Sequence, residues 1–116
     1  MSDAVINVEK TDNPPATIVA PQGNVDMSTS PELRQALRSA LDSSPARLIV
    51  DLSDVSYMDS SGLATLVEAM RTAKSSPRIP MVLCGLNDTV RAIFEIARLH
   101  QFFEIAPSRD DAMQTA

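Results

Sequence analysis

The chain has 116 residues, 44% of them apolar, which is enough for one domain with its own hydrophobic core over residues 1–116. Its net charge is -5, from 10 basic and 15 acidic residues without a basic stripe, and this argues against direct binding of nucleic acid. The single cysteine, Cys84, excludes a disulfide framework and a zinc site of several cysteines, and its apolar neighbours indicate a thiol buried in the core.

No stretch of the sequence has the length of a membrane span. Residues 1–10 alternate polar and apolar side chains, and the longest apolar runs elsewhere are far shorter than the roughly 20 residues that cross a bilayer. We therefore expect a cytoplasmic protein without a signal peptide or membrane insertion.

The first part of the chain predicts an antiparallel hairpin. Residues 4–10 have the alternation of a half-exposed edge strand, and residues 16–20 are typical of a second strand. The turn sequence Asp-Asn-Pro-Pro at residues 12–15 separates the two strands, and so short a connection favours antiparallel pairing.

A helix follows the loop at residues 23–26. Its start is open between two registers, because Thr29 has a glutamate at capping-box spacing and Ser30 precedes a proline. The body of the helix is indicated by an apolar stripe at i, i+4, i+7 and i+8, formed by Leu33, Leu37, Ala40 and Leu41.

The rest of the chain alternates predicted strands and helices. Residues 48–52 are apolar without alternation, which is expected of a central strand, and residues 53–59 are expected to form a loop. A second helix follows, with an inner face of Leu63, Leu66, Val67 and Met70 and with Glu68 solvated. After it the sequence predicts a strand at 81–84 and a third helix, capped by Asn87 or Asp88. The chain ends with a short edge strand within 102–106 and a helical turn from Ser108. This order predicts a single α/β domain with a mixed, mostly parallel sheet of four to five strands, an antiparallel N-terminal edge strand and three to four helices.

Polar residues follow several of the predicted strands. Because the carboxyl ends of parallel strands meet at one edge of a sheet, we expect the loops at 23–26, 53–60 and 85–88 to share a rim. This places Asp26 near Ser60, and Met27 beside Asp26 is a candidate apolar contact for a partner.

The second helix opens with an unusual density of polar groups. In the sequence Met-Asp-Ser-Ser-Gly-Leu at residues 58–63, the aspartate and serines are explained either as helix caps or as the surroundings of a modified serine. A helix N-terminus tolerates a phosphate, which would add a charge of about -1.5 to -2 beside Asp59.

The same stretch resembles the core signature of the STAS domain, which bacterial anti-sigma factor antagonists share. The resemblance is carried by residues 48–52, Val55 and residues 58–63, and it extends to the Gly-x-x-Asp sequence at residues 23–26. The length of the chain fits one STAS-like domain.

The resemblance implies that the chain is an anti-sigma factor antagonist that works by partner switching. In such proteins the unmodified antagonist binds an anti-sigma factor that is also a serine kinase, phosphorylation of the first serine after the aspartate ends the binding, and a serine phosphatase restores it. That serine corresponds to Ser60. The nucleotide and its metal belong to the kinase, so no cofactor is expected in this chain. The partner is expected to contact Asp26, Met27, Asp59, Ser61 and Gly62.

Two other functions compete with this one. A serine hydrolase would need glycine where Met58 lies and a histidine base, but the single histidine, His100, follows the third helix, so we do not expect an enzyme. A similar STAS domain also serves as a non-switching subunit of lipid-transport or stress-signalling complexes. The serine at position 60 favours the switch.

Overall fold

A β-hairpin opens the fold. In the computed structural model, which describes residues 5–75 and 77–114, β1 (Val5–Asp12) pairs antiparallel with β2 (Pro15–Val25). The hairpin and the edge position of β1 are as predicted, but β2 continues well beyond the expected end at Ala20. The remaining elements, in chain order, are α1 (Ser30–Asp42), β3 (Leu48–Asp51), β4 (Val55–Met58), α2 (Ser60–Lys74), β5 (Met81–Cys84), α3 (Asp88–Ile96), β6 (Glu104–Ala106) and α4 (Arg109–Gln114).

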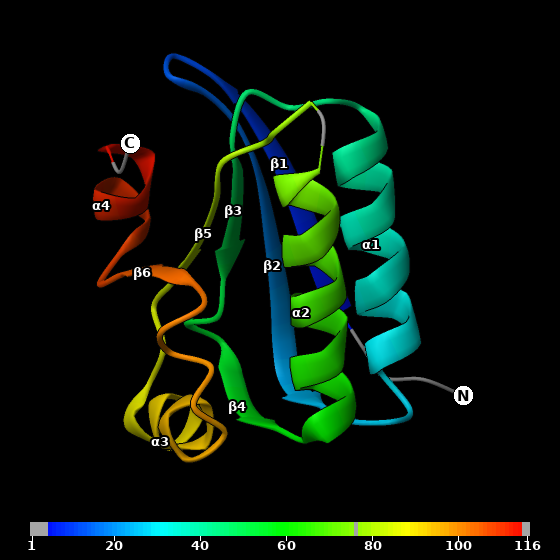
Figure 1. The fold of residues 1–116 in the computed structure, drawn as a ribbon, viewed down its shortest axis with the longest axis vertical. Helices are drawn as coiled ribbons and strands as arrows, with labels where there is room; N and C mark the ends of the chain where they lie inside the picture. The colour runs from blue at the N-terminus through cyan, green and yellow to red at the C-terminus, as the bar shows by residue number, and fades with distance from the viewer. Residues whose placement is uncertain (1–4, 76, 115–116) are drawn as a thin grey trace.

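The sheet is mixed, with parallel pairing everywhere except at β1. Its strands lie in the order β1-β2-β3-β5-β6, and β4 pairs with β2 off this path (Figure 1). The length of β2 gives it two successive parallel partners, because residues 17–19 pair with β3 and residues 23–25 pair with β4. The predicted single α/β domain with an antiparallel N-terminal edge strand is confirmed.

The strand count is higher than predicted, because the sheet has six strands and not four to five. The additional strand is β4, which lies in the segment 53–59 that was expected to be a loop. Val55 and Met58 at its ends are buried, whereas Ser56 and Tyr57 between them are exposed. This burial pattern has no alternation with a period of two, so the sequence carries no clear strand signal there.

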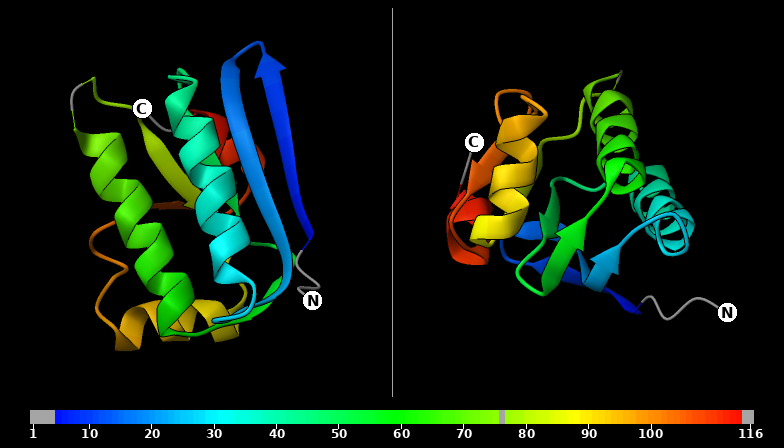
Figure 2. Two further views of the ribbon diagram at one scale, coloured as in Figure 1. Left: turned by 90° about the vertical axis from the view of Figure 1, so that its right-hand side faces the viewer. Right: turned by 90° about the horizontal axis from the view of Figure 1, so that it is seen from below.

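Helices cover both faces of the sheet. Figure 2 shows α1 and α2 together on one face, α4 on the opposite face and α3 near β4 at one end of the molecule. The four predicted residues of the α1 stripe are all buried in the larger core, which confirms the predicted inner face. The smaller core lies under α4 and consists of Ala16, Ile18, Ile49, Val82, Cys84, Ala106 and Ala112.

Several local predictions are resolved by the structure. Asn87, and not Asp88, caps α3, with its side chain accepting a hydrogen bond from the Val90 N–H. Glu68 is not merely solvated, because it pairs with two arginines of α1 and so joins α1 to α2. Cys84 is fully buried, and burial raises the pKa of its thiol to about 12. No helix among the described residues is long and apolar enough to cross a membrane.

Candidate functional site

The candidate site lies where β2 and β4 end side by side. Val25 and Met58 are paired in the parallel ladder, and the N–H of the next residue, Asp59, donates to the Val25 carbonyl at 3.0 Å. Asp26 and Asp59 therefore follow directly from paired strand ends, next to the first turn of α2 (Figure 1). The expected meeting of the 23–26 loop with the start of the second helix is found.

Asp59 caps α2. Its Oδ1 accepts hydrogen bonds from the Ser61 N–H at 2.9 Å, the Gly62 N–H at 3.2 Å and the Ser61 hydroxyl. These donors, the Ser61 hydroxyl above all, hold the pKa of Asp59 below its usual value, although partial burial and the nearby Asp26 charge act in the opposite direction. Asp59 is therefore a carboxylate at neutral pH, and it already occupies two of the unpaired N–H groups of the helix start.

The two serines of the motif differ in their exposure and in the hydrogen bonding of their hydroxyls. Ser61 is partly buried and its hydroxyl donates to Asp59. Ser60 is exposed, and its hydroxyl has no hydrogen-bond partner among the described residues. Ser60 thus offers a free hydroxyl at the rim, whereas Ser61 is part of the cap.

Asp26 is held in a tight turn of its own. Its Oδ1 accepts from the Ser28 hydroxyl at 2.7 Å and the Ser28 N–H at 2.9 Å, and these bonds, led by the hydroxyl, lower the pKa of Asp26. The Asp26 N–H donates to the Thr29 hydroxyl, which in turn donates to the Asn24 carbonyl at 2.9 Å. Of the two registers left open for the helix start, Thr29 is the residue that precedes α1, but its hydroxyl is engaged in this turn and caps no N–H of the helix.

Gly62 allows α2 to begin against the end of β2. A Cβ at this position would collide with Met58 Cγ and would lie 2.9 Å from Val25 Cγ1 and 3.1 Å from the Val25 carbonyl oxygen. The glycine is therefore required by close packing beneath the rim, and it is buried. This makes a direct contact with a partner less expected of Gly62 than of its exposed neighbours.

Two large apolar side chains are exposed beside the two aspartates. Met27, which was predicted to lie on the rim, is 79% exposed. Tyr57 on β4 is 48% exposed, and the sequence pattern does not indicate it because that pattern predicts a loop there. The signal that was available is that this is the single tyrosine of the chain and lies within a polar segment.

The third predicted rim loop, residues 85–88, supports β4. The Asn87 side chain donates to the Val55 carbonyl at 2.7 Å while it caps α3. Gly85 has a φ of +74°, and a Cβ there would lie 2.9 Å from Ser53 Cβ and 3.0 Å from Asp51 Oδ1. This loop therefore supports the start of β4, whereas Asp59 and Ser60 follow the other end of that strand.

The arrangement presents the exposed Ser60 hydroxyl next to Asp59 in the chain, with Asp26 at the neighbouring strand end. Within residues 5–75 and 77–114 there is no group of three metal-ligating side chains, and no base is hydrogen-bonded to Ser60. His100 lies in the turn after α3, partly buried. The rim thus combines one exposed hydroxyl, that of Ser60, with the carboxylates of Asp26 and Asp59.

Comparison with known proteins agrees with the geometry of the rim. Residues 6–112 match the family model of the STAS domain. The chain belongs to the STAS domain family. Among curated proteins, this STAS domain is 36% identical over 83 residues to the anti-sigma-B factor antagonist of Listeria monocytogenes, which covers 72% of each chain. It is 28% identical over 100 residues to the anti-sigma-B factor antagonist of Staphylococcus aureus, covering 86% of this chain and 92% of the other.

Solved structures share the same fold. The STAS domain described here superposes on the crystal structure of an anti-sigma factor antagonist from Mycobacterium paratuberculosis with a TM-score of 0.86 and 28% identity, covering 97% of this chain and 92% of the other. The hairpin, the mixed sheet and the helices on both faces therefore belong to the common fold of these antagonists.

Proposed function

We propose that this STAS domain is an anti-sigma factor antagonist that binds an anti-sigma factor with serine kinase activity and is released when Ser60 is phosphorylated. A serine phosphatase would return it to the binding state. The proposal follows the names of the relatives that match most of the chain. It is also supported by the geometry of the rim.

The observation that carries the proposal is the difference between Ser60 and Ser61. A kinase needs a hydroxyl that reaches the solvent and can rotate toward a phosphoryl donor, and Ser60 alone of the two has an exposed, unpartnered hydroxyl. The same exposure would make the phosphate accessible to a phosphatase.

The surroundings of Ser60 explain why a phosphate would end binding. Asp59 already occupies the Ser61 and Gly62 N–H groups, so a phosphate on Ser60 would not find these donors free. Its charge of about -1.5 to -2 would add to the carboxylates of Asp26 and Asp59. If the partner places a carboxylate about 6 Å away, an effective dielectric of about 20 gives about 3 kcal/mol of repulsion per charge pair, roughly a hundredfold in affinity.

The unmodified rim has the mixed character of a docking surface. Met27 and Tyr57 provide exposed apolar area next to the two carboxylates, and an aromatic side chain beside fixed charges is a common anchor of protein interfaces. Asp26 and Asp59 favour basic groups of the partner at the matching positions, whereas release on phosphorylation requires a partner carboxylate opposite Ser60 itself.

Phosphorylation by the cognate kinase tests the acceptor. After incubation of the full chain with the kinase and ATP, intact-mass analysis should find one added phosphate on the wild type, none on Ser60→Ala and one on the matched control Ser61→Ala. Phosphate that persists on Ser60→Ala would assign the acceptor to another residue and contradict the proposal.

Binding of the same kinase tests the switch. Ser60→Asp adds one negative charge and should weaken binding by at least about tenfold relative to the wild type. Repulsion within a single charge pair of this kind lowers the affinity by up to about a hundredfold. Ser60→Asn, which has nearly the same shape without the charge, should bind much more tightly than Ser60→Asp. Equal affinities of the two variants would rule out a charge mechanism.

A further inference from the structure

A cleft of about 360 Å³ lies at the end of α2 that is opposite to Ser60. Figure 1 shows α2 running from the rim to this far end, near the start of β5. The residues that line the cleft come from the end of α2, the chain before and within β5, and the segment that leads into β6: Met70, Ala73, Lys74, Arg78, Ile79, Pro80, Met81, Val82, Gln101, Phe102, Phe103 and Glu104.

The cleft has an apolar floor. Met70, Ala73, Val82 and Phe103 are each less than 10% exposed and belong to the two hydrophobic cores. Phe102 beside them is 57% exposed, so its ring extends the apolar lining toward the solvent. Such a floor can receive the apolar body of a small ligand without any rearrangement of charged groups.

The rim of the cleft is basic, although the chain as a whole carries a net charge of -5. Lys74 and Arg78 are exposed and form no ion pair with any described residue, whereas Arg34, Arg38 and Arg109 are each paired with carboxylates. The end of the helix dipole accounts for Lys74 but not for Arg78, which lies beyond the helix. Glu104 is the one carboxylate of the lining, so the two cations outnumber it.

We propose that this cleft binds a small amphipathic carboxylate, with its apolar body on the floor and its carboxylate between Lys74 and Arg78. Gln101, which also lines the cleft, can donate a further hydrogen bond to the carboxylate. The volume is at the lower end of the range of small-molecule sites, about 300–1,000 Å³, which suits a short chain or a single ring and not a protein segment. The site is separate from the phosphorylation rim, so the inference does not depend on the proposed function.

Titration of the full chain with two carboxylates and an alcohol tests the inference. Octanoate represents a single-chain ligand, 3-phenylpropanoate a single-ring ligand, and 1-octanol has the chain without the charge. In amide NMR spectra at least one carboxylate should give saturable shifts at Met81, Val82 and Phe103, with unchanged signals at Asp26 and Ser60. The alcohol should bind at least about fivefold more weakly than octanoate, because it lacks the contact with the two cations.

A pair of double variants separates the basic rim from general charge effects. Lys74→Gln combined with Arg78→Gln should weaken carboxylate binding by about tenfold. The matched control, Lys10→Gln with Arg91→Gln, removes one lysine and one arginine that are exposed and unpaired elsewhere in the described chain, and should bind as the wild type does. The inference is overturned if neither carboxylate gives saturable shifts, if octanol binds as well as octanoate, or if both double variants lose affinity equally.

Discussion

Gly62 lies where the first turn of α2 meets the ends of β2 and β4. Glycine within a helix normally costs about 1 kcal/mol relative to alanine. Here the missing side chain allows a closer approach than any other residue would, because a Cβ would collide with Met58 and press on Val25. The same contact brings the Asp59 cap next to the 23–26 loop.

We predict that Gly62→Ala destabilises the protein by about 1–3 kcal/mol, the usual effect of overpacking a tight core site. Helix propensity alone predicts the opposite sign, a stabilisation of about 1 kcal/mol, so the two explanations are separated by the direction of the change. Urea unfolding measures it. Ala64→Ser, an exposed change on the same helix, is the control and should alter stability by less than about 0.5 kcal/mol.

The sequence could not distinguish Ser60 from Ser61, because both are serines at the start of the same helix. The pattern predicted a capped helix and a polar rim, and both are found. The resemblance selected Ser60 as the acceptor, which stays a prediction. The difference between the two hydroxyls depends on which of them the Asp59 carboxylate reaches, and that is a matter of χ angles and local packing.

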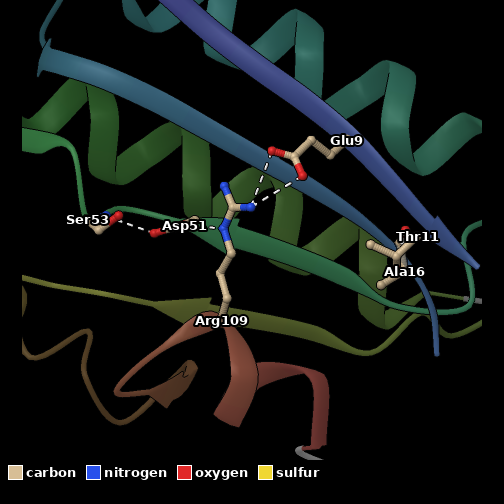
Figure 3. A network of polar contacts seen from close by, with 6 residues as sticks. All are labelled: Glu9, Thr11, Ala16, Asp51, Ser53 and Arg109. Atoms are coloured by element: carbon tan, nitrogen blue, oxygen red, sulfur yellow. Dashed lines mark hydrogen bonds and ion pairs between the residues drawn. The ribbon is translucent and has the colours of Figure 1, made fainter. Parts of the chain in front are cut away.

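At the level of whole elements, α4 is attached to the back of the sheet by the ion pairs of Arg109, a hydrogen bond from Arg47 to the Ala112 carbonyl and a small apolar patch. Figure 3 shows the Arg109 side chain reaching from α4 to Asp51 at the end of β3 and to Glu9 on β1. Asp51 also accepts from the Ser53 N–H at 3.0 Å, so one carboxylate holds α4 and the chain that leads into β4. Ala112, fully buried, is the apolar part of this attachment.

We predict that Arg109→Met loosens α4 and lowers the unfolding free energy by about 1–2 kcal/mol at pH 7. The change leaves the Asp51 carboxylate, which is almost buried, without its cation, but the partial exposure of Arg109 keeps the loss below that of a fully buried pair. Urea unfolding gives the loss, and faster amide exchange in α4 and β6 locates it. Arg91→Met, at an exposed arginine without an ion pair, is the matched control and should change little.

The pH dependence of this loss follows from the pKa of Asp51. Burial alone would raise this pKa, but the Ser53 N–H and the Arg109 guanidinium outweigh burial and lower it from 3.8. The contribution of the pair is therefore complete above about pH 4 and is lost as the pH falls through the lowered pKa. The difference between wild type and Arg109→Met should shrink below pH 4, and an undiminished difference at pH 3 would contradict the ion-pair explanation.

Elements with a clear apolar period were predicted well, and those defined by distant partners were not. The inner face of α1 follows directly from its leucine spacing. β4 was missed because its strand character comes from pairing with the far end of β2, more than thirty residues earlier in the chain. The strand β2 also runs through two residues that usually end a strand: Pro21 is held by pairing with β1 and Gly23 by pairing with β4.

At the scale of the whole molecule, the described carboxylates with resolved pKa shifts all titrate below their usual values. They are Asp26, Asp51, Asp59 and Glu68, and each accepts hydrogen bonds from nearby donors. Protonation of these groups removes the stabilising hydrogen bonds of their charged forms. Acidification also reduces the net negative charge of the chain and its self-repulsion, which by itself would raise the stability. The local contacts are direct and the net charge is modest, so we expect the local contacts to dominate.

We therefore predict that stability is greatest above about pH 5 and falls as the pH is lowered to 3. A carboxylate with a lowered folded-state pKa contributes stability above its unfolded value and loses it as the pH falls through the folded one. Urea midpoints at pH 6, 4.5 and 3 measure the trend. Asp59→Asn keeps a weaker cap without a titrating group, so its urea midpoint should be lower at pH 6 and should decrease less between pH 6 and pH 3. A wild-type midpoint that does not change with pH would contradict the prediction.

The sharing of β2 between β3 and β4 has a consequence for recognition. Asp26 and Asp59 extend from neighbouring ends of one ladder, so their spacing is set before any encounter and a docking protein has little conformational entropy to remove. On the proposed function, a phosphate on Ser60 would act on this template through its charge and not by deforming it. Crystal structures of the modified and unmodified chain should therefore superpose closely at the rim while their surface potentials differ.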